Sequence, residues 1–270
     1  MVLIQHIEMV QKTFYWWRGR AMKLIKKFLF KILPERIYLK ILHRFFYILY
    51  DLKLLKKNKS FKYHYKVKEL IHDGDVIIDI GANLGYFSKT FSRLSPNGKV
   101  LCVEPLPQYY SILKYFLGAR KNVEIHNVAL GKNAGEVTMI LPKSDGMIRT
   151  GLPYISKPGE KSEHPTQQVK IVNPKSLLND FSKIDYIKCD IEGFEWIVFQ
   201  ELKEILIQYQ PMVQIEISKE NTGKMIPFFI DLGYVQYGIS NFKIIQENGK
   251  QIEPGDYLFV PKIKEKMIMA

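Results

Sequence analysis

Four charged side chains lie within eight residues in the second half of the chain, in the pattern Lys188-x-Asp190-x-Glu192-Gly193-x-Glu195. Gathering three acids and a lysine in one place costs free energy unless they pair with one another or bind a ligand. The group directly follows a short apolar run, so we expect it where a buried strand ends. An acid at such a point can orient a hydroxyl group and accept its proton. We therefore predict Asp190, Lys188 and Glu192 as catalytic, with Asp190 acting on the hydroxyl directly or through water.

Some of these acids also have a purely structural interpretation. Glu192 and Glu195 stand at the first turn of the next predicted helix, where acids complement the helix dipole. Lys188 and Asp190 share one face of the strand, because side chains alternate along it, and an ion pair between them is expected. Glu216 lies in a later apolar run and points into the same crevice or toward a neighbouring charge. Asp190 and Glu216 are candidates for a divalent cation, but no His stands at metal-ligand spacing, and we predict no metal.

A second motif is a glycine-containing turn with the pattern Asp79-x-Gly81-x-Asn83-x-Gly85, which follows an apolar, β-branched run. The dinucleotide fingerprint G-x-G-x-x-G would need glycines where Asn83 and Tyr86 stand. Its second glycine lets a pyrophosphate approach the backbone, so a nicotinamide cofactor is disfavoured. The turn instead suits a ligand with a carboxylate, an amine and no phosphate, such as the methionine part of S-adenosylmethionine.

An acid at the end of the following strand completes this cofactor hypothesis. Glu104 stands 25 residues after Asp79, close to the roughly 20 residues at which such folds place the acid that binds ribose hydroxyls. The alternative is an ordinary tight turn and an unrelated surface Glu.

The elements around these motifs alternate between strands and helices. Apolar runs predict strands at 75–80, 99–103, 123–128, 137–141, 184–189, 212–217, 234–239 and 257–260. Helices are predicted at 86–94, 109–117, 176–181, 194–208 and 224–232. This alternation indicates a doubly wound α/β sheet, which binds ligands beyond the carboxyl ends of its strands, and the last two strands are expected to pair antiparallel. Residues 142–168 show no periodicity and are expected to form a long irregular loop.

The net charge of +13 is confined to one end of this chain of 270 residues. Residues 1–70 contain 17 Lys or Arg and four Asp or Glu, whereas the remaining residues are balanced. We therefore predict a basic helical segment at 1–68 and one α/β domain at 69–270. Cys102 and Cys189 fall on strands that flank the first strand, about 10 Å apart and too far for a disulfide. Free thiols fit a reducing cytoplasm.

The basic segment predicts two amphipathic helices, 21–33 and 36–49, separated at Pro34. Trp16 and Trp17 add to its aromatic content. Three interpretations remain open: packing on the following domain, attachment of residues 1–60 to an anionic membrane surface, or binding of nucleic acid. The balanced charge of the α/β domain argues against nucleic acid as the substrate. No uninterrupted run reaches the ~18 apolar residues of a membrane span, and a secretory leader is not recognised. The expected location is the cytoplasm or the inner face of a membrane.

Taken together, the motifs from about Ile71 to Pro261 resemble the FkbM-type methyltransferases. The resemblance rests on these stretches in order: Asp79–Gly85 with Tyr86-Phe87-Ser88, Glu104-Pro105, Asn127-x-Ala129-Leu130-Gly131, Ile187–Glu195, and Pro211 followed by Glu216. The Lys-x-Asp-x-Glu-Gly-x-Glu element is the specific part, whereas the glycine turn is common to class I methyltransferases. One departure is Asn173–Leu177, where many members carry a Thr-Leu-Asp element.

The resemblance implies a seven-stranded, Rossmann-like class I fold and S-adenosylmethionine as cofactor. It also implies O-methylation of a small-molecule or glycan acceptor, most often a sugar hydroxyl of a glycan or glycosylated natural product. The cofactor-binding residues would be Asp79, Gly81, Asn83, Gly85, Tyr86, Phe87, Glu104, Pro105, Asn127, Ala129 and Asp190. His126 and His164 compete with Asp190 as the base. The alternatives are a nucleic-acid methyltransferase or a non-catalytic S-adenosylmethionine-binding module.

Overall fold

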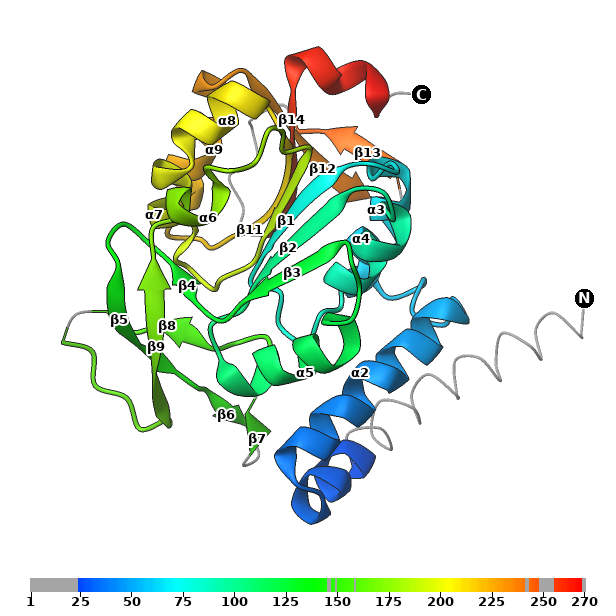
Figure 1. Ribbon diagram of the computed structural model, residues 1–270, viewed down its shortest axis with the longest axis vertical. Helices are drawn as coiled ribbons and strands as arrows, with labels where there is room; N and C mark the ends of the chain where they lie inside the picture. The colour runs from blue at the N-terminus through cyan, green and yellow to red at the C-terminus, as the bar shows by residue number, and fades with distance from the viewer. Residues whose placement is uncertain are drawn as a thin grey trace, which may run out of the picture.

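The computed structural model describes residues 24–144, 147–148, 150–157, 159–240, 243–247 and 255–268. Trp16 and Trp17, and the first part of the basic segment with them, lie outside these residues. Figure 1 shows a central sheet covered by helices on both faces, with a smaller sheet beside it and helix α2 running alongside α5.

In the described part of the chain, the central sheet has eight strands in the order β13-β12-β14-β11-β10-β1-β2-β3. They are β1 Val76–Ile80, β2 Lys99–Val103, β3 Val123–His126, β10 Tyr186–Cys189, β11 Met212–Ile217, β12 Tyr234–Ser240, β13 Lys243–Gln246 and β14 Gly255–Pro261. Strands β3, β2, β1, β10 and β11 are parallel, and β14 runs antiparallel to both β11 and β12. The predicted class I arrangement is confirmed, including the antiparallel pair of late strands. Strand β13 pairs with β12 and makes the sheet one strand wider than predicted.

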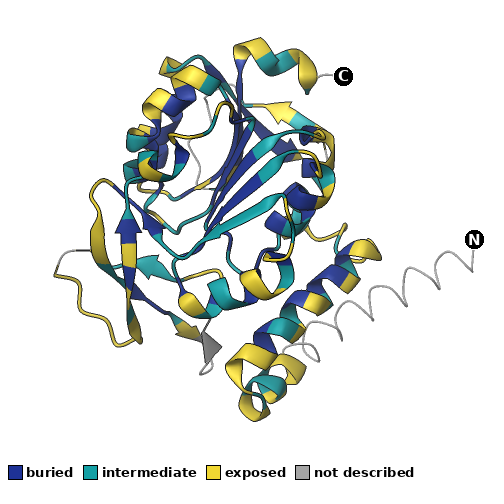
Figure 2. Ribbon diagram, viewed as in Figure 1, coloured by how far each residue is buried: buried dark blue, intermediate teal, exposed yellow. Residues whose placement is uncertain are grey.

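The central strands are apolar on both faces because helices cover both. In β1, four of the five side chains are buried, and Figure 2 shows the central strands as the buried interior of the domain. The helices are α4 Ser88–Leu94, α5 Pro107–Leu117, α6 Lys175–Leu178, α7 Glu195–Glu201, α8 Lys203–Tyr209 and α9 Thr222–Asp231. The single helix predicted over 194–208 is two helices in the structure, because Leu202 separates the end of α7 from the start of α8.

The prediction of an irregular loop at 142–168 is wrong in part. A second sheet, in the order β4-β9-β5-β8, uses this segment and its flanks. Its strands are β4 Ala129–Leu130, β5 Gly135–Ile140, β8 Tyr154–Ile155 and β9 Thr166–Val172, while β6 Lys143–Ser144 and β7 Met147–Ile148 form a separate pair. In β9, Val169 and Ile171 are buried between exposed neighbours, so this strand does alternate. The short strands gain stability only by pairing, β8 with β5, β4 with β9 and β6 with β7, and no local pattern reveals these contacts.

The described helices of the basic segment pack on the α/β domain. They are residues 24–32, α2 Glu35–Asp51, the 3-10 turn η1 Lys59–Phe61 and α3 Lys62–Leu70. Outside this segment, a second 3-10 turn, η2 Lys262–Met267, follows the last strand. The Tyr47 hydroxyl donates to the carbonyl oxygen of Tyr86 at 2.6 Å, and the rings of Phe46 and Tyr86 lie 4.4 Å apart. Tyr63 and Val67 of α3 enter a core cluster that includes β1 and β2. The division at residue 68 remains a prediction.

Two further expectations concern the membrane and the cysteines. Within the described residues, no helix combines the length and the apolar composition that crossing a bilayer requires. Cys102 and Cys189 are both buried free thiols, as predicted from the strand order.

Replacement of Phe46 tests whether α2 and the domain unfold together. Phe46 is buried among Tyr47, Tyr50 and Tyr86, so Phe46→Ala should lower the free energy of unfolding by about 3 kcal/mol. Ile48→Ala on the exposed side of α2 should change it by about 0.5 kcal/mol or less. Urea titration followed by circular dichroism measures both. Equal small effects would show that α2 contributes little to domain stability.

Candidate active site

The carboxyl ends of β1, β2 and β10 meet at the point where the strand order of the sheet reverses. Strand β1 lies between β2 and β10, and such reversals form ligand-binding crevices. A hollow of about 640 Å³ up to its open mouth lies there, and we call it the cleft. Its lining includes the predicted residues Gly81, Asn83, Glu104, Pro105, Ala129, Asp190 and Glu192.

Glu104 is held at the wall of the cleft by two backbone groups. One carboxylate oxygen accepts the N–H of Asn83 at 2.8 Å and the other accepts the N–H of Leu106 at 2.9 Å. Burial raises the pKa of Glu104 to about 7, although both hydrogen bonds oppose this shift. Asn83 has φ +53°, in the left-handed region, and its side-chain amide donates to the carbonyl oxygen of Thr150. The turn after β1 therefore fixes the acid at the end of β2.

Gly81 stands where a side chain has no room. Its φ is +75°, and a Cβ there would lie 2.0 Å from the carbonyl oxygen of Asp190. The glycine thus lets the turn after β1 touch the end of β10.

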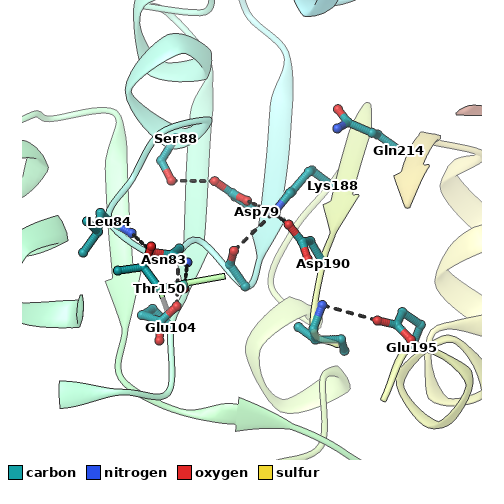
Figure 3. A network of polar contacts seen from close by, with 12 residues as sticks. Asp79, Asn83, Leu84, Ser88, Glu104, Thr150, Lys188, Asp190, Glu195 and Gln214 are labelled. Atoms are coloured by element: carbon teal, nitrogen blue, oxygen red, sulfur yellow. Dashed lines mark hydrogen bonds and ion pairs between the residues drawn. The ribbon is translucent and has the colours of Figure 1, made fainter. Parts of the chain in front are cut away.

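A buried lysine links the two strand ends. The Nζ atom of Lys188 lies 3.3 Å from a carboxylate oxygen of Asp190 and 3.8 Å from one of Asp79, and it donates to the carbonyl oxygen of Gly81 at 3.2 Å (Figure 3). Asp79 is fully buried and also accepts the Ser88 hydroxyl at 2.5 Å. Burial lowers the pKa of Lys188, but the carboxylates of Asp190 and Asp79 outweigh burial and raise it. The predicted ion pair of Lys188 and Asp190 is present, with the lysine charged.

A second hollow adjoins the cleft, and we call it the polar pocket. It is lined by Ser60, Tyr63, His64, Phe87, Lys188, Cys189, Asp190, Gln214, Glu216 and Asp256. Of the predicted catalytic residues, Lys188 lines this pocket, Glu192 lines the cleft, and Asp190 lines both. Asp190 therefore lies at the border between the two hollows.

Carboxyl groups crowd the side of the polar pocket next to Asp190. Oxygens of Asp190, Glu192 and Glu216 lie within 4.8 Å of one another, and Asp256 pairs with Glu216 in the register of β14 and β11. Burial and the charges of Asp190 and Asp256 raise the pKa of Glu216 to about 8. Burial and the charge of Asp190 raise that of Glu192 to about 7. Asp190 and Glu216 are thus neighbours, as a shared cation would require, although our prediction remains that no metal is bound.

Several predicted cofactor residues support the cleft without lining it. Asp79 pairs with Lys188, as described above. Asn127 donates its amide to the carbonyl oxygens of Glu104 and Pro105, and so shapes the cleft wall. A Cβ on Gly85 would lie 2.6 Å from Leu113, so this glycine serves helix packing.

Neither of the two aromatic residues predicted at the cofactor lines the cleft. The Tyr86 ring faces α2 and belongs to the aromatic cluster around Phe46, and Phe87 lines the polar pocket. The competing bases also lie away from the site. His126 pairs with Glu124 at 2.6 Å, and His164 is exposed, and neither lines the cleft or the polar pocket.

Sequence reasoning missed part of both linings. Thr150 and Pro153 line the cleft, and Ser60, Tyr63, His64, Gln214 and Asp256 line the polar pocket. Asp256 could have been found from the sequence, because it directly precedes the predicted strand at 257–260, which belongs to the expected antiparallel pair. His64 had none, because nothing near it in the sequence suggests a ligand.

Comparison with known proteins finds one domain family and several relatives. The methyltransferase FkbM domain matches residues 79–235, which is more than half of the chain. The 2-O-methyltransferase NoeI of Sinorhizobium fredii is 28% identical over 163 residues, covering 56% of this chain and 67% of that protein. Methyltransferase 1 of Beauveria bassiana is 26% identical over 159 residues, covering 49% of this chain and 60% of that protein. A crystal structure of a methyltransferase FkbM from Methylobacillus flagellatus covers 70% of this chain and 44% of its own, with a TM-score of 0.48 and 13% identity.

The raised pKa of Glu216 predicts how the stability of the protein depends on pH. A carboxyl group whose pKa rises on folding, here from 4.5 to about 8, makes the folded state less stable as pH increases between these values. Glu216→Gln removes this penalty, so its free energy of unfolding relative to wild type should be higher at about pH 9 than at about pH 5. Urea titrations at both pH values measure the difference.

Exposed Glu136 on β5 gives the control, because Glu136→Gln lies far along the chain from this acidic group and in the other sheet. An unchanged stability difference for Glu216→Gln at the two pH values would contradict the crowding of carboxylates in the pocket.

Proposed function

The chain belongs to the FkbM methyltransferase family, and from this premise we propose that it methylates a sugar hydroxyl of a glycan or of a glycosylated natural product. It is a methyltransferase, and S-adenosylmethionine is its cofactor. The observation that carries the proposal is the position of Asp190, which lines both the cleft and the polar pocket. The relative NoeI is named a 2-O-methyltransferase, which agrees with a hydroxyl group as acceptor.

The residues of the cleft fit S-adenosylmethionine. Glu104 offers a fixed carboxylate for the ribose hydroxyls, and Val128, Ala129 and Leu130 form an apolar wall for the adenine ring. The turn from Gly81 to Asn83 would hold the methionine part. When bound, S-adenosylmethionine supplies a methyl group activated by a sulfonium charge.

The residues of this chain align the acceptor hydroxyl and accept its proton. Methyl transfer to oxygen needs the acceptor hydroxyl in line and its proton removed. Asp190 orients the hydroxyl and takes the proton, while the ammonium group of Lys188 holds the Asp190 carboxylate 3.3 Å away. Glu192, which lines the cleft, positions the acceptor hydroxyl from the cleft side. A hydroxyl bound in the polar pocket would meet Asp190 at the border of the cleft.

Replacement of Asp190 by Asn tests this function. The variant keeps the size of the side chain but not its proton affinity, so kcat should fall by roughly 10²–10⁴-fold. The variant must still bind S-adenosylhomocysteine, so that lost turnover reports the base and not lost cofactor. The assay follows transfer of a labelled methyl group from S-adenosylmethionine to a panel of methyl hexosides and methyl 6-deoxyhexosides, with calorimetry for cofactor binding.

Short RNA and DNA oligonucleotides serve as competing acceptors in the same assay, and exposed Asp231→Asn on α9 is the control variant. Methylation of oligonucleotides alone would refute the sugar hydroxyl as acceptor. Near-normal turnover by Asp190→Asn would refute the assignment of the base.

The exposed side of the N-terminal helices supports a second part of the proposal, contact with an anionic membrane surface. Ile37, Ile41, Ile48 and Leu52 recur at helical spacing along α2 and are exposed. Leu24, Ile25, Phe28 and Ile32 of the preceding helical stretch are exposed as well. Exposed basic residues flank them, namely Lys26, Lys31, Arg36 and Arg44. An apolar stripe flanked by cations matches a helix that lies in the headgroup region of anionic lipids.

Two substitutions on this stripe test the membrane contact. Ile37→Ser combined with Ile48→Ser should weaken binding to vesicles containing phosphatidylglycerol by about tenfold or more, because each buried isoleucine contributes about 1.5–3 kcal/mol. Ile207→Ser on α8 is the control, since Ile207 and Ile48 are both 55% exposed. Vesicle co-sedimentation measures binding of the full chain. Equal binding of the double variant and the wild type would contradict the proposed contact.

A further inference from the structure

We propose, building on the function proposed above, that the polar pocket binds a neutral or amine-bearing saccharide acceptor and that the N-terminal segment forms one wall of this acceptor site. Ser60 and His64 are the residues through which that wall contacts the acceptor. The segment would thus be part of the active site in addition to any role at a surface.

The wall is held in place from two sides. The Tyr63 hydroxyl donates to the backbone oxygen of Asp256 at 2.9 Å, which ties α3 to β14. The Tyr50 hydroxyl donates to the backbone oxygen of His64 at 2.7 Å, which ties α3 to α2. The His64 ring also stacks on Phe87 with a centroid distance of 3.7 Å. Tyr63 and His64 are therefore held in place by contacts with β14, α2 and Phe87.

His64 carries a polar ring whose hydrogen bonds the protein does not complete. Its Nδ1 atom is sealed from solvent and has no hydrogen-bond partner among the described residues. Burial and the nearby charge of Lys188 lower the pKa of His64 to about 3, so the ring is neutral at physiological pH. A neutral imidazole offers one N–H donor and one acceptor nitrogen, which suits a hydroxyl group. A buried ring nitrogen left without a partner costs free energy, and such exceptions call for an explanation, a functional role among them.

The charges of the pocket select the kind of ligand. Asp190, Glu216 and Asp256 supply carboxyl oxygens, which accept hydrogen bonds, and Glu216, with its pKa raised to about 8, also offers an O–H donor near neutral pH. Among the described residues that line the pocket, Lys188 is the one cation, and it is already paired with Asp190 and Asp79. A phosphate or a uronic acid would find no unpaired cation among these lining residues and would be repelled by the ionised acids, whereas sugar hydroxyls donate to the carboxyl oxygens. The pocket therefore favours saccharides without negative charge.

The cleft and the polar pocket differ in their dependence on the N-terminal segment. Ser60, Tyr63 and His64 line the polar pocket, and none of the three lines the cleft. Changes at these positions should affect acceptor binding and leave cofactor binding unchanged. This separation allows a test that a general loss of structure would not imitate.

Two variants of the full chain test the wall. His64→Phe keeps an aromatic ring against Phe87 but removes its hydrogen-bonding atoms, and Ser60→Trp fills the pocket from an exposed position with little risk to folding. Each should raise KM for an accepted methyl glycoside by about tenfold or more, the effect of roughly one hydrogen bond. The dissociation constant for S-adenosylhomocysteine should stay within about twofold of wild type, while His64→Asn should recover part of the affinity.

Lys59→Trp is the matched control, because Lys59 precedes Ser60 in the same turn, is exposed, and does not line the pocket. If methyl glycosides are methylated but His64→Phe and Ser60→Trp keep the wild-type KM, the acceptor wall is refuted and the proposed function stands. Equal effects of Lys59→Trp and Ser60→Trp would also refute the wall. If S-adenosylhomocysteine binds but no glycoside is methylated, the proposed function and the acceptor site fail together.

Discussion

The ammonium group of Lys188, buried between two carboxylates, is the interaction on which the site depends. Its side chain is 5% exposed, and a charge in such a place is stable only if partners surround it. Asp79 at the end of β1, Asp190 after β10 and the carbonyl oxygen of Gly81 together supply them. Removing one partner would leave an uncompensated buried charge. The lysine therefore holds the ends of two neighbouring strands in one arrangement.

This arrangement extends to the cofactor side of the active site. The turn held by Gly81 presents the backbone of Asn83 to the Glu104 carboxylate, which is fixed at the end of β2. Three strand ends thus act as one rigid unit, and the cleft lies between them. Only glycine fits at position 81, because a side chain would collide with the backbone of Asp190. The cleft proposed for the cofactor and the position of the proposed base, Asp190, consequently depend on the same packing.

On the other side of Asp190, the protein assembles carboxylates without assembling enough cations to balance them. Glu216 and Asp256 face each other across antiparallel strands, and burial together with repulsion from Asp190 and Asp256 raises the pKa of Glu216. A ligand that donates several hydrogen bonds relieves this repulsion. The N-terminal helices close the same pocket with Ser60 and His64 while their opposite side carries exposed isoleucines and basic residues. In the function proposed above, one segment would face the sugar and a lipid surface at once, which suits an acceptor attached to a membrane.

The cleft was largely predictable because its key residues directly follow strands. Gly81, Glu104 and Asp190 each stand at the end of an apolar run, and the order of a doubly wound sheet then brings those ends together. Tyr86, which was predicted at the cofactor, does not line the cleft, because a residue next to the glycine turn can face either the ligand or the helix that packs behind it. In this protein α2 supplies Phe46, and the Tyr86 ring packs there.

The sequence alone determined the sheet, the cofactor turn, Glu104 and the charged group around Asp190, since periodicity and strand-end position act over a few residues. Only the tertiary structure decided that Tyr154–Ile155 and Thr166–Val172 pair with β5, that Glu216 meets Asp256, and that His64 reaches the pocket beside Lys188. These contacts join segments far apart in the chain, and His64 and Gln214 are about 150 residues apart. Their free energy comes from burial and charge pairing across the whole fold, which no local pattern records.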